Sequence, residues 1–210
     1  MPLFNTKSFL RQEQYRALQN LEVNGEILDV GGSHRSGYLE LIKGNHTVLV
    51  GNIDDSYEID VNFDAEKPWP FADGRFDCVL FINLLEHLFD YAHALSEAHR
   101  VLRKGGKIVC VIPFMFPVHG SPSDYFRFTR FALEKILQNT GFQNITITEL
   151  GTGAFSVVYH ALIGLVRWNW LVAPLIGLCR LGDRFLLFLK KDNKMSAKFM
   201  PLGYYFEATK

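Results

Sequence analysis

Two uninterrupted apolar segments in the middle of the chain restrict the folds that it can adopt. Residues 76–82 (Phe-Asp-Cys-Val-Leu-Phe-Ile) and residues 107–112 (Lys-Ile-Val-Cys-Val-Ile) are short and rich in β-branched and aromatic side chains. A strand with apolar side chains at successive positions must be covered on both faces, as in a parallel sheet between two layers of helices. These segments therefore predict an α/β fold.

Weaker patterns before and after these segments supply the other elements. Further strands are expected at residues 26–32, 47–50, 57–63, 144–150 and 203–209. Helices are expected at residues 8–20, 37–42 and 129–141, and from Asp90 to the stop signal Lys104-Gly105-Gly106. Because alternating strands and helices need crossover connections, we expect a doubly wound, mostly parallel seven-stranded sheet.

The length of 210 residues suits one domain, and we predict a single domain over residues 1–210. Within it, residues 1–22 carry the N-terminal helix. Residues 151–202 interrupt the alternation, because this stretch is apolar and contains Gly and Pro. It is predicted to be a helical apolar insertion before the last strand.

The composition narrows the classes of partner and compartment. The 22 basic and 22 acidic residues give a net charge of zero without a basic stripe, so no nucleic-acid partner is expected. Cys78, Cys110 and Cys179 are scattered, which is typical of free thiols in a reducing compartment. The first residues lack an apolar signal-peptide core. We therefore expect a cytoplasmic protein.

Candidate ligand-binding residues follow the predicted strands. In an open parallel sheet, ligands bind beyond the carboxyl ends of the strands, where the strand order switches. After the first strand the chain has Gly31 and Gly32, whose backbone can approach a ligand closely. Asn52 follows the second strand, Asp64 the third and Asn83 the fourth. A ligand cleft is therefore predicted at this edge.

An ordered series of motifs gives a family resemblance. Its parts are Asp29-Val-Gly-Gly32, Asp64-Ala65, Pro70-Phe-Ala-Asp-Gly-Arg-Phe-Asp77, Leu85-Glu-His-Leu88 and Arg100-Val-Leu-Arg-Lys-Gly-Gly106. From about residue 27 to 112 this series resembles the class I S-adenosylmethionine-dependent methyltransferases of the type 11 branch. The resemblance implies a Rossmann-like methyltransferase fold, a methyltransferase activity and S-adenosylmethionine as the cofactor.

The resemblance also implies roles for particular residues. Asp29, Gly31 and Gly32 would form the loop under the amino-acid part of the cofactor. Asn52, with Asp54 just beyond it, would meet the ribose hydroxyls. The adenine would meet Asp64 and the backbone of Ala65. Asn83 would line the pocket where the methyl group faces its acceptor, with His87 close by or, alternatively, packing the start of the next helix.

One departure from the family pattern keeps a second function open. Ser33, His34 and Arg35 stand where the family has further glycines. The alternative is therefore a non-catalytic, methyltransferase-like binding or scaffold protein. A dehydrogenase is disfavoured, because the G-x-G-x-x-G fingerprint is missing after the first strand.

The segment 114–130 follows the fifth strand and should overhang the acceptor. His119 is the candidate base, Asp124 could orient it, and Arg127 could bind an anionic group. Alternatively, Asp124 and Arg127 form a structural ion pair and His119 only shapes the loop. The other histidines lack ligand-like spacing, so no metal site is expected. A subgroup that often accompanies surface-polysaccharide genes is similar in Pro113-Phe114, His119, Pro122, Asp124-Tyr125, Arg127-Phe-Thr129 and residues 203–210. The expected acceptor is a small molecule, a glycan or a lipid-linked compound.

The apolar insertion has three interpretations. Between residues 151 and 179 only Arg167 is charged, and Arg167 and Pro174 leave no apolar run of the roughly 20 residues that span a membrane. The insertion could form a lid over the acceptor pocket or the surface of a homodimer, or it could fill part of the core. It could also make a peripheral contact with the inner face of the membrane through residues 154–191, where Trp168 and Trp170 and several basic residues would suit an interface.

Overall fold

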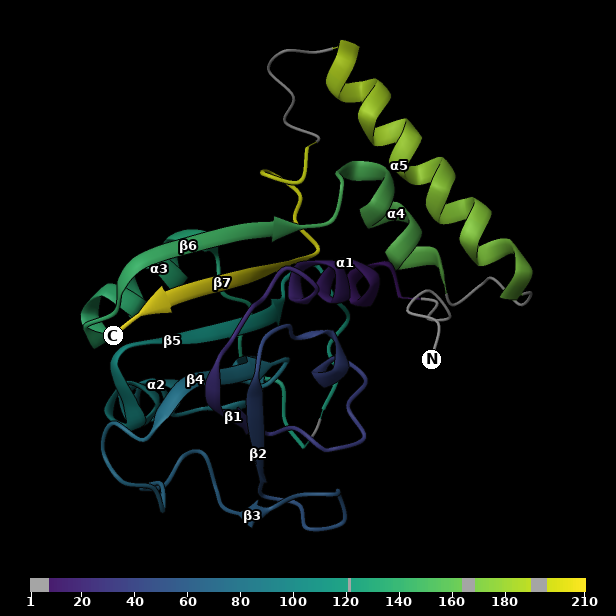
Figure 1. Cartoon of the computed structure of the whole chain (residues 1–210). Coiled ribbons are helices and arrows are strands. Elements are labelled where there is room, and N and C mark those ends of the chain that lie inside the picture. Colours follow the sequence, from purple (N-terminus) through teal and green to yellow (C-terminus); the bar gives the residue numbers. More distant parts are fainter. Residues whose placement is uncertain (1–7, 121, 164–168, 190–195) are drawn as a thin grey trace.

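A computed structural model describes residues 8–120, 122–163, 169–189 and 196–210 of the chain. Its centre is one seven-stranded sheet with the order β3-β2-β1-β4-β5-β7-β6 (Figure 1). The strands are β1 (Gly25–Val30), β2 (His46–Asn52), β3 (Val61–Asn62), β4 (Phe76–Ile82), β5 (Leu102–Pro113), β6 (Gln143–Leu150) and β7 (Gly203–Thr209). Strands β1 to β5 pair in parallel, and β7 runs antiparallel to both β5 and β6. The predicted fold class is confirmed.

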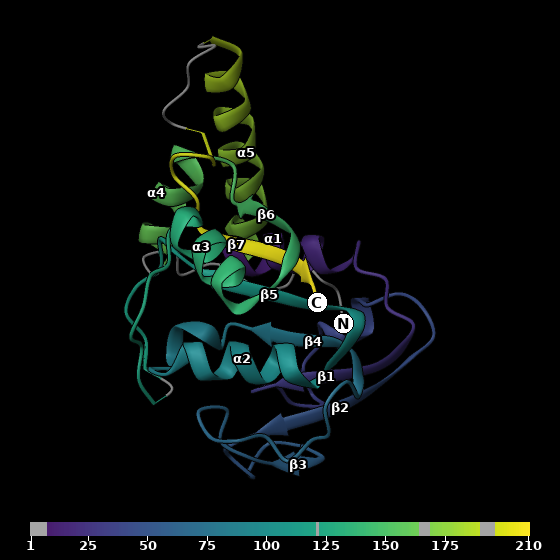
Figure 2. The same ribbon diagram turned by 90° about the vertical axis from the view of Figure 1, so that its left-hand side faces the viewer.

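Helices cover both faces of this sheet, as the apolar strands require. On one face, α2 (Tyr91–Val101) and α3 (Arg130–Thr140) pack over Val79 and Phe81 of β4. On the other face, α1 (Phe9–Leu18) and α4 (Ala154–Leu162) pack over Cys78 and Leu80 of the same strand. Figure 2 shows α2 and α3 on one side of the sheet. Each side of β4 therefore contributes to a separate core.

The predicted cap residues begin the helices. Ser8, Asp90 and Thr129 each accept a hydrogen bond from a backbone N–H in the first turn of α1, α2 and α3. Gly141 ends α3 in the left-handed conformation, with φ 100°. These short-range signals place three helix starts correctly, because a cap acts within one turn.

Three predicted elements differ from the structure. The helix expected at 37–42 is only a 3-10 turn, Leu39–Leu41, since Tyr38 is held by a hydrogen bond to Asp29. The strand expected at 57–63 is reduced to β3, because the Asp60 side chain takes the N–H of Val50. Helix α2 ends at Val101, short of the predicted stop signal, since the next residue pairs with Phe76 and begins β5.

The insertion before β7 is helical, as predicted. It contains α4, a 3-10 turn (Asn169–Leu171) and α5 (Val172–Leu189), and α5 rises away from the sheet (Figure 1). No helix in the described part of the chain is both long enough and apolar enough to cross a membrane. The two helices are joined by Asp183, whose side chain is 2% exposed. Its carboxylate accepts hydrogen bonds from the backbone N–H groups of Phe155 and Ser156 and from the Thr152 hydroxyl.

The substitution Asp183→Ala should therefore lower the free energy of unfolding by about 2–3 kcal/mol, because it removes the cap of α4 and leaves buried donors unpaired. Urea denaturation measures the change. The matched control is Asp55→Ala, which removes an exposed carboxylate and should change stability by less than about 0.5 kcal/mol. Equal losses in the two variants would contradict this role for Asp183.

Candidate functional site

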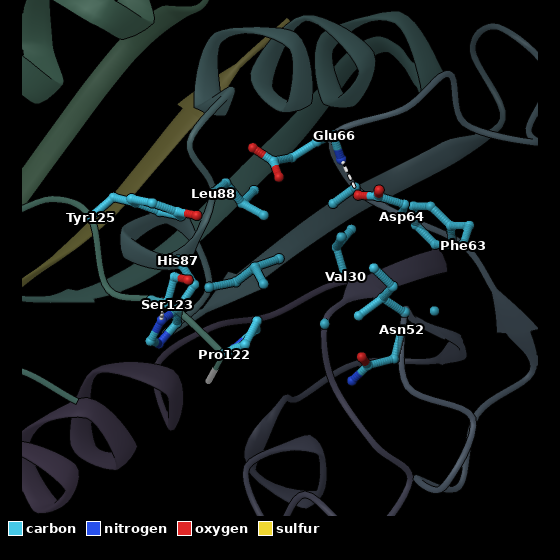
Figure 3. Close-up of a pocket in the computed structure, with 15 residues that line it drawn as sticks. Val30, Asn52, Phe63, Asp64, Glu66, His87, Leu88, Pro122, Ser123 and Tyr125 are labelled. Atoms are coloured by element: carbon cyan, nitrogen blue, oxygen red, sulfur yellow. Dashed lines mark hydrogen bonds between the residues drawn. The ribbon is translucent and has the colours of Figure 1, made fainter. Parts of the chain in front are cut away.

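A cleft lies at the carboxyl ends of β1, β2 and β4, where the strand order switches on either side of β1. Figure 3 shows Val30, Asn52 and Asp64 on one side of the cleft and His87 and Tyr125 on the other. Most of the predicted cofactor residues line this cleft and its extension: Gly31, Gly32, Asn52, Asp54, Asp64, Ala65, Asn83 and His87. The sequence-based location of a ligand cleft therefore agrees with the geometry.

The floor of the cleft requires glycine at two positions. Gly31 has φ 75°, and a Cβ there would lie 2.7 Å from a methyl carbon of Leu84. A Cβ on Gly32 would lie 1.8 Å from the Asp29 carboxylate. The positive φ disfavours a side chain at Gly31, and the buried Asp29 carboxylate leaves no room for one at Gly32, so both positions favour glycine. This bare backbone can approach a ligand closely.

Asp29 lies directly beneath this glycine turn and is fully buried. Its Oδ2 accepts a hydrogen bond of 2.7 Å from the hydroxyl of Tyr38, whereas Oδ1 has no hydrogen-bond partner among the described residues. Burial raises the pKa of Asp29 to about 7, against the opposing effects of Tyr38 and His34. Tyr38 was not predicted, because its role depends on this contact and the surrounding sequence has no motif that marks it.

The second strand ends in a side chain that ties two turns together. The amide of Asn52 donates to the carbonyl of Gly32 at 2.9 Å, and its oxygen accepts from the N–H of Asp54 at 3.2 Å. The carboxylate of Asp54 is exposed beside it and lines the wider part of the cleft. Together these two residues form a polar edge next to the glycine turn.

The atypical segment after Gly32 is turned toward the neighbouring loop. Ser33 is buried, and its hydroxyl accepts from the N–H of Arg35. His34 contacts Asp60 at 2.7 Å, and Arg35 forms an ion pair with Glu58 at 3.0 Å. The side chains that replace glycines thus fasten this turn to residues 58–60, and the floor of the cleft keeps its two glycines.

On the same side of the cleft as Asn52, Asp64 and Ala65 follow β3. The Asp64 carboxylate accepts from the N–H of Glu66 at 2.9 Å, which fixes the turn. The carbonyl of Ala65 accepts from the indole N–H of Trp69 at 3.0 Å. Phe63 closes the base of this wall, with its ring 5.4 Å from that of Trp69. The resulting pocket combines the apolar ring of Phe63 with the carboxylates of Asp64 and Glu66.

Asn83 marks the boundary between the cleft and a second pocket. Its backbone has φ 54°, an uncommon conformation for a residue other than glycine. Its amide forms a reciprocal pair with buried Gln14 of α1, with distances of 2.7 and 3.3 Å. Sequence reasoning missed Gln14, because the partners are 69 positions apart and no local pattern connects them.

The second pocket includes His119 of the segment that follows β5. It is lined by Ser8, Leu10, Arg11, Gln14, Asn83, Pro113, Phe116 and His119. The backbone N–H of His119 donates to Asp124 at 2.9 Å, and its Nδ1 lies 3.3 Å from the same carboxylate. The predicted contact between Asp124 and His119 is therefore present in the structure.

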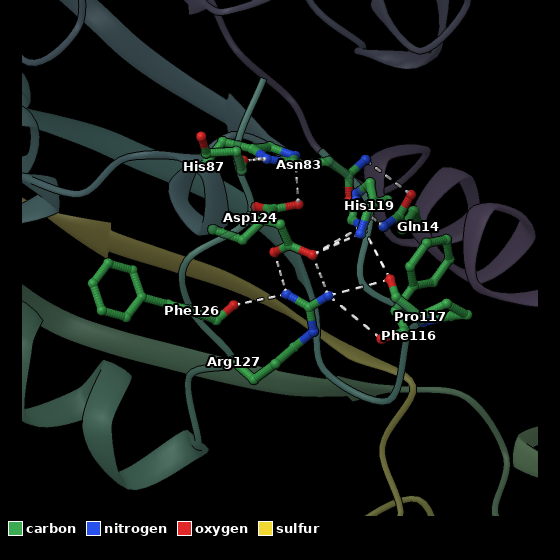
Figure 4. Close-up of polar contacts among 11 residues, drawn as sticks. Gln14, Asn83, His87, Phe116, Pro117, His119, Asp124, Phe126 and Arg127 are labelled. Atoms are coloured by element: carbon green, nitrogen blue, oxygen red, sulfur yellow. Dashed lines mark hydrogen bonds and ion pairs between the residues drawn. The ribbon is translucent and has the colours of Figure 1, made fainter. Parts of the chain in front are cut away.

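Asp124 and Arg127 form a two-bond ion pair within this loop (Figure 4). The guanidinium holds the pKa of the Asp124 carboxyl well below its usual range. The same guanidinium donates to the carbonyls of Phe126, Phe116 and Pro117. Arg127 thus points into its own loop, and this arrangement favours the structural alternative for the pair.

His87 and Glu86 lie between the two pockets. Nδ1 of His87 contacts the carbonyl oxygen of Ser123, and its ring lies 5.0 Å from that of His119. Glu86 is fully buried, and neither of its carboxylate oxygens has a hydrogen-bond partner among the described residues. Burial raises the pKa of Glu86 to about 8. The ligand atoms of Glu86, His87 and His119 all lie within 4.8 Å of one another.

Comparisons with known proteins agree with this geometry. Residues 45–110 match the family model described as a methyltransferase domain. A ubiquinone/menaquinone biosynthesis C-methyltransferase of Haemophilus ducreyi is 33% identical over 110 residues, which cover 52% of this chain and 36% of that protein. A demethylmenaquinone methyltransferase of Alkalihalophilus pseudofirmus is 48% identical over 42 residues, which cover 20% of this chain and 18% of that protein. The chain therefore spans only part of the length of these curated relatives.

Solved structures show the same fold over nearly the whole chain. An S-adenosylmethionine-dependent methyltransferase from Archaeoglobus fulgidus has a TM-score of 0.62 at 18% identity, covering 98% of this chain and 95% of that one. A methyltransferase from Thermotoga maritima has a TM-score of 0.62 at 15% identity, covering 97% and 91%. These structures confirm the predicted Rossmann-like methyltransferase fold, and the family-model match at residues 45–110 supports the predicted resemblance to the type 11 branch. The matches also support the expectations of a methyltransferase and of S-adenosylmethionine as its cofactor.

The raised pKa of Asp29 gives a pH-dependent prediction. An unfolded Asp titrates at roughly 4, so between there and the folded value of about 7 the unfolded state binds fewer protons. Asp29 therefore lowers the free energy of unfolding as the pH rises through this interval. The variant Asp29→Asn does not titrate and keeps an acceptor for Tyr38. Its stability relative to the wild type should increase from pH 5 to pH 8, as urea denaturation at several pH values will show. A difference that stays constant over this interval would contradict the prediction.

Proposed function

We propose that this chain transfers a methyl group from S-adenosylmethionine to an acceptor bound in the pocket beside His119. The observation that carries the proposal is the glycine turn above Asp29, which opens on a cleft at the switch in strand order. The bare backbone of this turn can approach the amino-acid group of a ligand, and the unpartnered Oδ1 of buried Asp29 lies directly beneath the turn. The match of residues 45–110 to the methyltransferase domain supports the same conclusion.

Three groups of residues in the cleft suit the three parts of this cofactor: its amino-acid portion, its ribose and its adenine. Gly31 and Gly32 would carry its amino-acid portion, with Asp29 beneath them. Asn52 and Asp54 would bind the ribose, since a carboxylate beside an amide oxygen offers several acceptors to hydroxyl groups. Asp64 and Ala65, near the ring of Phe63, would hold the adenine. When bound, the cofactor supplies an activated methyl group on a sulfonium.

The acceptor end depends on alignment more than on strong acids or bases. Asn83 lies between the two pockets, and Gln14 fixes the direction of its amide. His119 is the ring that the second pocket presents to an acceptor. Asp124 and Arg127 act as positioning residues, because their ion pair holds the loop that carries His119.

Among small-molecule, glycan and lipid-linked acceptors, the structure favours a lipid-linked one, because α5 exposes an apolar stripe. Leu178, Leu181, Phe185 and Phe188 follow a helical spacing and are 60–86% exposed. Arg184 of α5 is also exposed and suits an anionic surface. We infer a peripheral membrane contact through α5 in preference to a lid, since α5 rises away from the sheet (Figure 1).

A quinone-type acceptor is the second candidate. Two of the curated relatives act, by their names, on menaquinone precursors or in ubiquinone and menaquinone biosynthesis. The side chains of Leu10, Pro113 and Phe116 give the second pocket an apolar part that could contact such a ring.

Cofactor binding tests the proposed activity first. Calorimetric titration with S-adenosylmethionine should give micromolar binding to the wild type and at least about tenfold weaker binding to Asp64→Ala, because one charge-assisted hydrogen bond is lost. Glu134→Ala, which removes an exposed carboxylate of α3, should bind as the wild type does. Acceptors are then screened by release of S-adenosylhomocysteine. No detectable binding to the folded wild type would favour the scaffold alternative.

Vesicle sedimentation tests the surface of α5. The wild type should sediment together with anionic vesicles. The double variant Phe185→Asp, Phe188→Asp should bind the vesicles at least about tenfold more weakly, because it places two charges in the apolar stripe. Phe131→Asp on α3 is the matched control, because Phe131 is 81% exposed elsewhere. Wild-type protein that stays in the supernatant would contradict the membrane contact. A dimer that dissociates in the double variant would assign the stripe to a second copy of the chain.

A further inference from the structure

Three side chains with metal-ligand chemistry meet at the wall between the cleft and the second pocket. Glu86 and His87 come from the turn after β4, and His119 comes from the loop after β5. One ligand atom from each lies within 4.8 Å of the other two. Nε2 of His87 is 3.7 Å from Oε1 of Glu86, close to the roughly 3.3 Å that separates two ligands of a tetrahedral zinc ion.

The environment of Glu86 lacks a partner for its carboxylate. The residue is 0% exposed, and neither oxygen has a hydrogen-bond partner among the described residues. The neighbouring cation, Arg127, is already bound to both oxygens of Asp124. A buried carboxylate without partners is costly, and coordination of a cation removes this cost.

The hydrogen bonds of the two imidazoles leave Nε2 of His87 and of His119 available to bind a metal. Nδ1 of His87 contacts the carbonyl of Ser123, and Nδ1 of His119 lies 3.2 Å from the carbonyl of Pro117. Because a carbonyl oxygen only accepts hydrogen bonds, these contacts favour the tautomer in which Nδ1 carries the proton. In the neutral form of that tautomer, Nε2 of each ring keeps its lone pair. Metal-bound histidines typically show this pattern, with the second nitrogen held by a carbonyl or a carboxylate such as Asp124.

We propose that Glu86, His87 and His119 bind a divalent transition-metal ion. Two imidazoles and one carboxylate are a ligand set of catalytic zinc and of non-haem iron(II), and both leave coordination positions open. His87 lines the cleft and His119 lines the second pocket. The open positions would therefore face a bound acceptor and hold one of its oxygen atoms near Asn83. This last role rests on the proposed function, whereas the metal site itself does not.

The spacing of these three residues along the chain does not indicate a metal site. Two of the ligands are adjacent, and the third lies 32 positions after His87 in a different loop. Repeated His and Cys spacings on one helix or turn, which identify many metal sites, are absent from this set. The parallel pairing of β4 with β5 brings the two loops together, and the backbone N–H of Tyr125 donates to the carbonyl of Glu86 between them.

Metal titration tests the proposal without cofactor or acceptor. Protein freed of metal by a chelator is titrated with ZnCl₂ in a calorimeter, and with CoCl₂ while visible absorption is recorded. The wild type should bind one equivalent, and each of Glu86→Gln, His87→Ala and His119→Ala should weaken binding at least about tenfold and lose the cobalt bands. The control is His46→Ala, which removes an imidazole at the opposite edge of the sheet, at the start of β2.

Circular dichroism establishes that each variant is folded, and His119→Ala is the mildest of them because its side chain is 37% exposed. A wild type that binds no ion, or a His46→Ala protein that loses as much affinity as the three ligand variants, would overturn the proposal. Protein that binds zinc but not S-adenosylmethionine would keep the metal site and reject the proposed function. Protein that binds S-adenosylmethionine but no zinc would reject the metal site and keep the proposed function.

Discussion

The burial of β4 on both faces is the constraint on which the rest of the molecule depends. Its side chains enter two separate cores, one beneath α2 and α3 and the other beneath α1 and α4. Two helical layers can cover one strand only if the chain crosses over between parallel neighbours, and β1 and β5 pair with β4 in this way. Because every crossover leads to another parallel strand, the carboxyl ends of these strands lie along the same edge of the sheet. The glycine turn, Asn83 and the His119 loop meet there for that reason.

The sequence predicted the features that short-range chemistry determines. Ser8, Asp90 and Thr129 act within a single helical turn, and each begins a helix as expected. The apolar runs of β4 and β5 identified buried strands, because they are too short for buried helices and have apolar residues at successive positions. The cofactor-type residues could be placed because each directly follows a strand. Their positions depend on topology, which the alternation of elements already implied.

What the sequence did not reveal depends on contacts between distant residues. Nothing near Asn83 indicates that a glutamine of α1 will bind its amide. Glu86 stood within a recognised motif, yet its lack of a partner and its distance from His119 follow only from the packing of two loops. The short β3 has the same kind of cause, since the side chain of Asp60 competes with backbone pairing. Propensity and periodicity describe neighbours in the chain, and these contacts are not between neighbours.

The position of α1 links the insertion to the candidate site. On one side, Phe9 packs edge-on against Tyr159 of α4, and Glu13 forms an ion pair of 2.7 Å with Arg180 of α5. On the other side, Gln14 binds the amide of Asn83. A shift of α5 would therefore reach Asn83 through α1 and two side-chain contacts, Arg180–Glu13 and Gln14–Asn83. Helix α1 thus contacts both the insertion and the residue that separates the two pockets, so that the packing of the insertion bears on the position of Asn83.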